Sequence, residues 1–235
     1  MQSIIHSPHT EQHKSQRSPW LRAAVLGVND GIVSTSGIML GVSGAAASPA
    51  TILTAGIAGL VAGAISMGVG EYVSVSSQKD SEKADIDIET RSIAENPQQE
   101  LAELAMIYQQ RGLNKELALE VAEQLHAYDA VSAHARDELN INQDVLPNPI
   151  QAASASMVAF SVGAFVPILA ALVAHGHNNI LVIVLVSMFG LAVSGSIGAY
   201  IGGGNRLLAA FRVLLGGAAA MAITYAIGVL VGHSL

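Results

Sequence analysis

Five long apolar runs dominate the pattern of hydrophobic and polar positions along the chain. They cover roughly residues 21–46, 52–74, 150–174, 180–201 and 207–231. A helix of about 20 apolar residues is long enough to cross a hydrocarbon core of about 30 Å. Because backbone groups in a membrane must satisfy one another, we expect each run to form a membrane-spanning α-helix. The pattern predicts an all-α membrane protein with five transmembrane helices.

The stretch between the second and third runs is polar, and its pattern predicts three helices. Helical composition continues from residue 71 to residue 94, so the second membrane helix is expected to extend beyond the membrane until Pro97 interrupts it. A helix from Pro97 to about residue 110 and another from about Asn114 to residue 139 follow, separated by the turn at Gly112. The sequence thus predicts a three-helix insert between membrane helices two and three.

These predictions divide the chain into four parts. Residues 1–19 form a polar tail, 20–78 the first two membrane helices, 79–149 the insert and 150–235 the last three membrane helices. The first apolar run is too long for a signal peptide and lies behind the polar tail, so we expect it to remain as a membrane helix.

Composition agrees with a membrane protein and excludes several kinds of chemistry. Only 12% of the 235 residues are charged, against about 25% in a typical soluble domain. The chain has no cysteine, which excludes disulfides, thiolate zinc sites and iron–sulfur clusters. Residues 79–149 hold 15 of the 18 acids and 6 of the 11 bases, a net charge of 6 − 15 = −9, while the rest of the chain carries 5 − 3 = +2. This acidic insert argues against a nucleic-acid partner.

The positions of the bases predict the orientation. With five spans, all 11 Lys and Arg residues fall on the side of the N-terminus and the insert. By the positive-inside rule, the N-terminus and residues 79–149 are cytoplasmic and the C-terminus is outside.

Glycine recurs with G-x-x-x-G spacing in four of the five apolar runs. Such spacing lets two helix backbones approach closely, either within one chain or across a dimer. We favour close packing within the bundle. The pairs are Gly27/Gly31, Gly37/Gly41, Gly59/Gly63, Gly198/Gly202 and Gly228/Gly232.

Two acids and a methionine are the candidate functional groups of the membrane part. Asp30 lies about ten residues into the first span, where a charge costs at least about 2.5–3.5 kcal/mol and usually faces a cavity, a partner or an ion. Met67 and Glu71 are four residues apart near the end of the second span, hence on one helix face. Carboxylate oxygens with a thioether sulfur suit a divalent transition metal better than Na⁺, K⁺ or Mg²⁺. A hydrogen-bonded Asp30 and a core-packing Met67 are the alternatives.

The insert carries two E-x-x-E pairs, Glu100/Glu103 and Glu120/Glu123. Carboxylates three apart share a helix face and bind metals when another helix supplies further ligands. Glu120 and Glu123 lie opposite the apolar positions of their helix, which favours a solvated surface. For Glu100 and Glu103, both a metal site and a solvated edge stay open.

The two histidines of the insert do not by themselves indicate a metal site. His126 and His134 lie eight residues apart near one face of the third insert helix, and either could be an ordinary surface residue.

Several motifs together resemble the vacuolar iron transporter family, which includes nodulin-21-like proteins. They are LGVNDG at 26–31, SMGVGEY at 66–72, PQQELAE at 97–103, HARDEL at 134–139 and GGGNR at 202–206. The resemblance runs from Pro19 to the C-terminus in the same order, and the chain is identified as a prokaryotic-type member.

The resemblance implies a homodimer of five-helix protomers, embedded in lipid, that exchanges Fe²⁺ or Mn²⁺ for protons without a prosthetic group. Asp30 and Met67 would line the translocation path at the dimer interface, and Glu71 would lie near its cytoplasmic mouth.

For the insert, the resemblance implies a cytoplasmic metal-binding domain. Glu100 and Glu103 match its glutamates, Glu89 matches one on the extended second helix, and Glu138 one on the last insert helix. Two departures from better-known plant members are Ser92, in place of a second carboxylate, and the pair at 135–136, Ala and Arg, in place of methionines.

We therefore expect an exporter that moves Fe²⁺ or Mn²⁺ out of the cytoplasm in exchange for protons, in a prokaryotic plasma membrane or a vacuolar one. The donor types do not choose between the two ions. A membrane-tethered ferritin-like oxidase and a metal sensor without transport are the alternatives. The insert lacks the Glu-x-x-His motif of ferritin-like sites, and a simple anchor has no use for Asp30.

Overall fold

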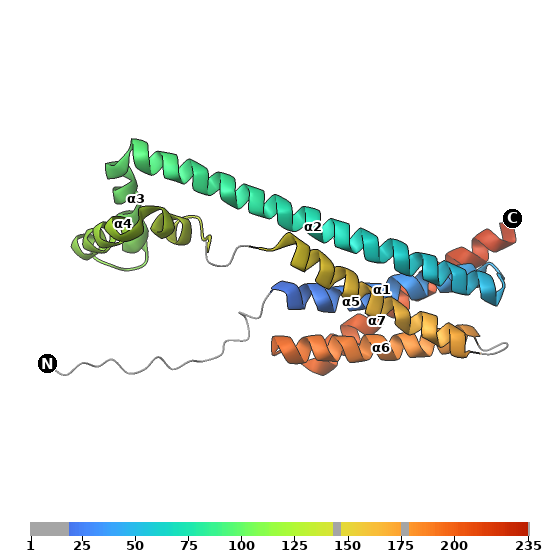
Figure 1. Cartoon of the computed structure of the whole chain (residues 1–235). Helices are drawn as coiled ribbons and strands as arrows, with labels where there is room; N and C mark the ends of the chain where they lie inside the picture. The colour runs from blue at the N-terminus through green and yellow to red at the C-terminus, as the bar shows by residue number, and fades with distance from the viewer. Residues whose placement is uncertain (1–18, 143–146, 175–178, 235) are drawn as a thin grey trace. The chain divides into compact units, whose positions relative to one another are not determined.

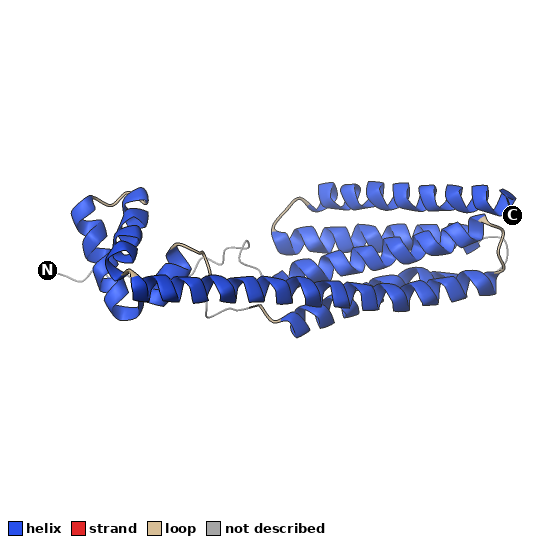
Figure 2. Cartoon of the chain, turned by 90° about the horizontal axis from the view of Figure 1, so that it is seen from above, coloured by secondary structure: helices blue, strands red, loops and turns tan. Residues whose placement is uncertain are grey.

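The computed structural model describes residues 19–142, 147–174 and 179–234. These residues form seven α-helices and no strand (Figures 1 and 2). The helices are α1 (Pro19–Gly44), α2 (Pro49–Glu95), α3 (Pro97–Gln110), α4 (Lys115–Asp137), α5 (Pro149–Val173), α6 (Asn179–Gly202) and α7 (Arg206–Ser234).

Five of these helices are long and apolar enough to cross a membrane, as the sequence predicted. The candidate spans lie in Ala24–Gly44, Pro49–Glu95, Pro149–Val173, Ile180–Gly202 and Arg206–Ser234. The fold is that of a multi-pass integral membrane protein.

The described helices group into two compact units. One contains residues 19–71 and 150–234, and the other contains Tyr72–Pro149. We call them the membrane unit and the insert. The single helix α2 belongs to both, and it ends at Glu95, directly before the predicted break at Pro97.

Close helix contacts hold the membrane unit together. The helix α1 packs on α6 and α7, and its Gly31 fits so tightly against α5 that a Cβ there would overlap the carbonyl oxygen of Phe160. On α7, a Cβ at Gly228 would overlap the carbonyl oxygen of Gly41. Since both contacts lie within one chain, these glycines serve the packing of its own bundle, the interpretation that the sequence favoured.

In the insert, α3 and α4 pack against each other around a small core that includes Leu104 and Ala122. The Asn114 side chain accepts a hydrogen bond from the amide of Leu117 and caps α4, as expected. The sequence predicted one helix here, and α4 is kinked within it at Asp129, whose φ of −161° and ψ of 92° are not helical. Its carboxylate accepts a bond of 3.0 Å from the amide of Ser132, so it caps the second half of α4.

A charged cluster joins the ends of α3 and α4. Asp137 accepts hydrogen bonds from Tyr108 Oη at 2.8 Å, from Arg111 at 2.6 Å and from Arg136 at 2.8 Å. Burial alone would raise the pKa of Asp137, but the bonds from Arg136, Arg111 and Tyr108 outweigh it and hold the pKa at about 2. This cluster fixes the last turn of α4.

Candidate metal centre

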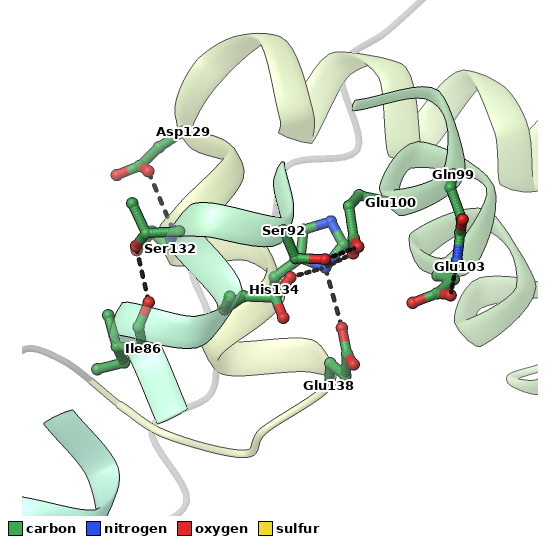
Figure 3. A network of polar contacts seen from close by, with 11 residues as sticks. Ile86, Ser92, Gln99, Glu100, Glu103, Asp129, Ser132, His134 and Glu138 are labelled. Carbon is green, nitrogen blue, oxygen red and sulfur yellow. Dashed lines mark hydrogen bonds and ion pairs between the residues drawn. The ribbon is translucent and has the colours of Figure 1, made fainter. Parts of the chain in front are cut away.

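Four potential metal ligands from three helices converge inside the insert. Glu89 comes from α2, Glu100 from α3 and His134 from α4, and Glu138 is the C-cap residue directly after α4. Each offers one ligand atom, and these atoms all lie within 4.8 Å of one another. Figure 3 shows Glu100, His134 and Glu138 pointing toward one another. We call this group the ligand cluster.

The Nδ1 atom of His134 lies close to all three carboxylates. It is 2.9 Å from Glu89 Oε1, 3.0 Å from Glu138 Oε2 and 3.9 Å from Glu100 Oε2. Glu138 follows His134 by four residues and keeps a helical backbone conformation as the C-cap of α4, so helix geometry alone places the two on one face. A cation bound among these oxygens would also be in reach of the nitrogen.

The ligand cluster is buried except at one side. His134 is 0% exposed, Glu100 4% and Glu89 7%. The side chain of Glu138 is 33% exposed, so the ligand cluster contacts solvent on the side of this residue. Buried charges persist in proteins only when they are paired, hydrogen-bonded or bound to metal.

The carboxylates repel one another in this setting. The pKa of Glu89 is raised, chiefly by burial and then by the negative charge of Glu138, and the opposing effect of His134 is smaller than either. A single imidazolium cannot balance three carboxylates. A divalent cation would neutralise two of the three negative charges, and it would bind more tightly as these groups lose their protons.

Two polar atoms of the ligand cluster lack hydrogen-bond partners among the described residues. The Nδ1 atom of His134 carries at most one hydrogen and makes its hydrogen bond with Glu138, and the buried Glu89 Oε1 receives none. The Nε2 atom of His134 is likewise buried without a partner. Glu100 is better satisfied, since Ser92 Oγ donates a short bond to its Oε1 (Figure 3). Ser92, which replaces the expected second carboxylate on α2, therefore orients one of the remaining ones.

The other glutamates of the insert stand apart from the ligand cluster. Glu103 is half-buried and accepts a bond of 3.3 Å from Gln99 instead (Figure 3). Glu120 and Glu123 are exposed on α4, in line with the solvated surface expected for them.

His134 is fully buried and His126 is half-buried, whereas the sequence allowed both to be ordinary surface residues. The ring of His126 meets the ring of His134 edge-to-face, with centroids 5.9 Å apart. Burial lowers the pKa of His126, and the neighbouring His134 lowers it further. The sequence left both histidines as possible surface residues, because the grouping of His134 with the glutamates appears only when the helices are packed together.

In the membrane unit, Asp30 is half-buried on α1 and accepts a hydrogen bond of 2.8 Å from Ser34 Oγ, one turn along the same helix. The preceding residue, Asn29, accepts a short bond from Ser194 Oγ of α6. Polar side chains of α1 and α6 thus meet inside the mostly apolar bundle.

Met67 and Glu71 lie on the α2 part of the membrane unit. Met67 packs against a cluster that contains Phe160 and Ala164 of α5, and Glu71 is half-buried. Among the described residues, no hydrogen bond or ion pair joins Asp30, Met67 and Glu71 to one another.

The fold and the ligand cluster together define a class: multi-pass helical membrane proteins with potential metal ligands gathered outside their apolar helices. Within this class the chain belongs to the VIT family, whose model matches residues 21–229.

Curated relatives cover nearly the whole chain. It is 46% identical over 223 residues to a "Vacuolar iron transporter" of Acanthamoeba castellanii, covering 94% of this chain and 82% of that protein. It is 36% identical over 227 residues to "VIT-like transporter 1b" of Glycine max, covering 96% and 82%. It is also 36% identical over 219 residues to "Vacuolar iron transporter homolog 2" of Arabidopsis thaliana, covering 93% and 87%.

Proposed function

We propose that this protein is a secondary transporter, not an enzyme, that moves Fe²⁺ or Mn²⁺ out of the cytoplasm in exchange for protons, as a homodimer. The observation that carries the proposal is the ligand cluster of Glu89, Glu100, His134 and Glu138 in a member of the VIT family. Two relatives named iron transporters, aligned over more than nine-tenths of this chain, support metal as the cargo.

In this proposal the insert collects metal on the cytoplasmic side. Glu89, Glu100 and Glu138 bind the ion together with His134. Glu103, one turn further along α3, adds negative charge that attracts cations to the cluster. Residues 79–149 carry a net charge of −9, so cations accumulate there before they enter the membrane.

Asp30 couples metal to proton flux in the membrane unit. A carboxylate binds either a proton or a cation, so one group can carry the two in turn. The Oγ of Ser34, at 2.8 Å, holds the Asp30 side chain in place. Glu71 receives the ion at the cytoplasmic mouth, and the thioether of Met67, one turn deeper on α2, supplies a soft donor along the path.

The direction of transport follows from the orientation that the bases predict. With the insert in the cytoplasm, metal collected there leaves the cytoplasm. The membrane is a prokaryotic plasma membrane or a vacuolar one, and the names of the relatives support the second.

The test is metal-driven proton movement in proteoliposomes that contain the full chain. We expect Asp30→Ala to abolish both metal uptake and the accompanying proton flux, because no other acid lies within the first apolar helix. Glu120→Gln, which removes an exposed acid of α4, is the matched control and should transport like the wild type. Size-exclusion chromatography verifies that Asp30→Ala remains folded and assembled.

Three results would contradict the proposal. Undiminished coupled flux in Asp30→Ala removes Asp30 from the path. Metal binding without transport by the wild-type protein indicates a sensor. Oxygen consumption that is stoichiometric with added Fe²⁺, again without transport, indicates an oxidase.

A further inference from the structure

His134 places a nitrogen donor among carboxylates. Its Nδ1 lies 2.9 Å and 3.0 Å from oxygens of Glu89 and Glu138, which are closer contacts than a fourth carboxylate could make without repulsion. The sequence motifs gave no reason to assign this residue to a metal site.

A purely structural role does not explain why the polar side chain of His134 is buried among carboxylates. The side chain is 0% exposed, and its Nε2 has no hydrogen-bond partner among the described residues. The arginines of the insert do not relieve the charge, because Arg111 and Arg136 pair with Asp137, and Arg91 donates to the carbonyl of Asp87. Even with a protonated imidazole, three carboxylates would leave the cluster with net negative charge in a buried site.

The position of the ring is also restrained. His126 packs edge-to-face against it at 5.9 Å, and the Nδ1 atom of His134 faces carboxylate oxygens of Glu89 and Glu138. Groups that fix the ring of a ligating histidine commonly decide how well it binds metal.

From this geometry we infer that His134 makes the ligand cluster discriminate among divalent ions, so that it prefers Fe²⁺ and the later metals Co²⁺, Ni²⁺ and Zn²⁺ to Mn²⁺. The inference rests on the proposed function, because it names which cargo the insert collects. Carboxylates alone suit Mg²⁺, Ca²⁺ and Mn²⁺, whereas imidazole suits Fe²⁺, Ni²⁺ and Zn²⁺, and affinity for mixed sites rises from Mn²⁺ through Fe²⁺ to Co²⁺.

The test compares Co²⁺ and Mn²⁺ binding to the full chain in detergent, with Co²⁺ as an air-stable stand-in for Fe²⁺. His6, His9 and His13 of the tail are replaced in every protein compared, so that the tail supplies no imidazole. We expect the wild-type cluster to bind Co²⁺ at least about tenfold more tightly than Mn²⁺, and His134→Gln to lower this ratio to less than about threefold.

Glu100→Gln is the matched control within the same site. It removes an oxygen ligand and leaves the nitrogen, so we expect weaker binding of both ions with the Co²⁺/Mn²⁺ ratio kept within about threefold of the wild type. His233→Gln in α7, where the imidazole bonds the carbonyl of Val229, should change neither affinity.

A spectroscopic measurement on the unsubstituted cluster keeps the inference testable if His134→Gln fails to fold. Pulsed electron paramagnetic resonance of bound Mn²⁺ should show a nitrogen coupling that changes when the protein is grown with ¹⁵N-histidine. Absence of this coupling overturns the inference.

A Co²⁺/Mn²⁺ ratio that is unchanged in His134→Gln, or that falls equally in Glu100→Gln, also overturns it. These outcomes are independent of the proteoliposome test, since a transporter with an unselective insert would still lose its flux in Asp30→Ala. Conversely, the protein could show the Co²⁺ preference and yet transport no metal. That result would support the inference about His134 and refute only the proposed function.

Discussion

Asp137 stabilises the fold one residue before a proposed metal ligand. It accepts hydrogen bonds from Tyr108, Arg111 and Arg136, and its own side chain is only 7% exposed. Because Glu138 follows directly, the position of this ligand depends on how well the last turn of α4 is held.

We expect Asp137→Asn to destabilise the last turn of α4 by about 1–2 kcal/mol at pH 7, a figure discounted because the paired arginines are exposed. The folded-state pKa of about 2 lies below the ordinary value of 3.8. The stabilisation is therefore fully present above about pH 4 and is lost as the pH falls toward 2.

Hydrogen–deuterium exchange of the full chain, read at the amides of Glu138 and Leu139, measures this effect, since both amides bond the carbonyl of His134. Asp85→Asn, at an exposed position of α2, is the control. A difference between variant and wild type that persists undiminished at pH 2 would show that the carboxylate charge is not its cause.

The sequence predicted the role of a single residue correctly where that role involves only neighbours along the chain. Asn114 was expected to cap α4 and does so. The inclusion of His134 in the ligand cluster depends on three helices meeting at one point, and no pattern along a single helix reports that. Glu103 shares a face with Glu100 but is held away by Gln99, again a contact that spacing alone does not define.

Between elements, α1 and α7 approach closely because glycines stand at their contact, where a side chain would not fit. A Cβ at Gly228 would overlap the carbonyl oxygen of Gly41, which is backbone and cannot move aside cheaply. Gly216 lies on the same helix, and apart from its own stretch of helix no atom of the described residues lies within 4 Å of the position a Cβ would take.

We expect Gly228→Ala to destabilise the membrane unit by about 1–3 kcal/mol or more, because it forces α1 and α7 apart. Gly216→Ala should be neutral or slightly stabilising, since alanine favours helix. Thermal unfolding of both variants in detergent, followed by size-exclusion chromatography, measures the difference. Equal stability of the two variants would mean that this close approach does not hold the bundle.

Element boundaries followed from the sequence where proline set them. α2 ends and α3 begins around Pro97, as predicted. The kink of α4 at Asp129 was not predicted, because an aspartate within a helical run is compatible with an exposed helix position as well as with a cap.

For the whole molecule, the lack of cysteine makes the orientation directly measurable. We expect a cysteine placed at Ala50, in the first turn of α2, to react with a membrane-impermeant maleimide in intact cells. A cysteine at Glu120, in the insert, should react only after the membrane is permeabilised.

Both positions are exposed, so differences in labelling report the side of the membrane and not burial. The unsubstituted chain, which has no thiol, gives the background. Labelling of the Glu120 position in intact cells would place the insert outside and reverse the direction of transport proposed above.

The uneven burial of the ligand cluster has a kinetic consequence. Glu89, Glu100 and His134 are sealed, whereas a third of the Glu138 side chain meets solvent. At the proposed site, an ion would therefore enter and leave by exchanging water for this one carboxylate, while the buried donors would supply the other ligands. A single exposed ligand of this kind suits a site that must release what it has captured.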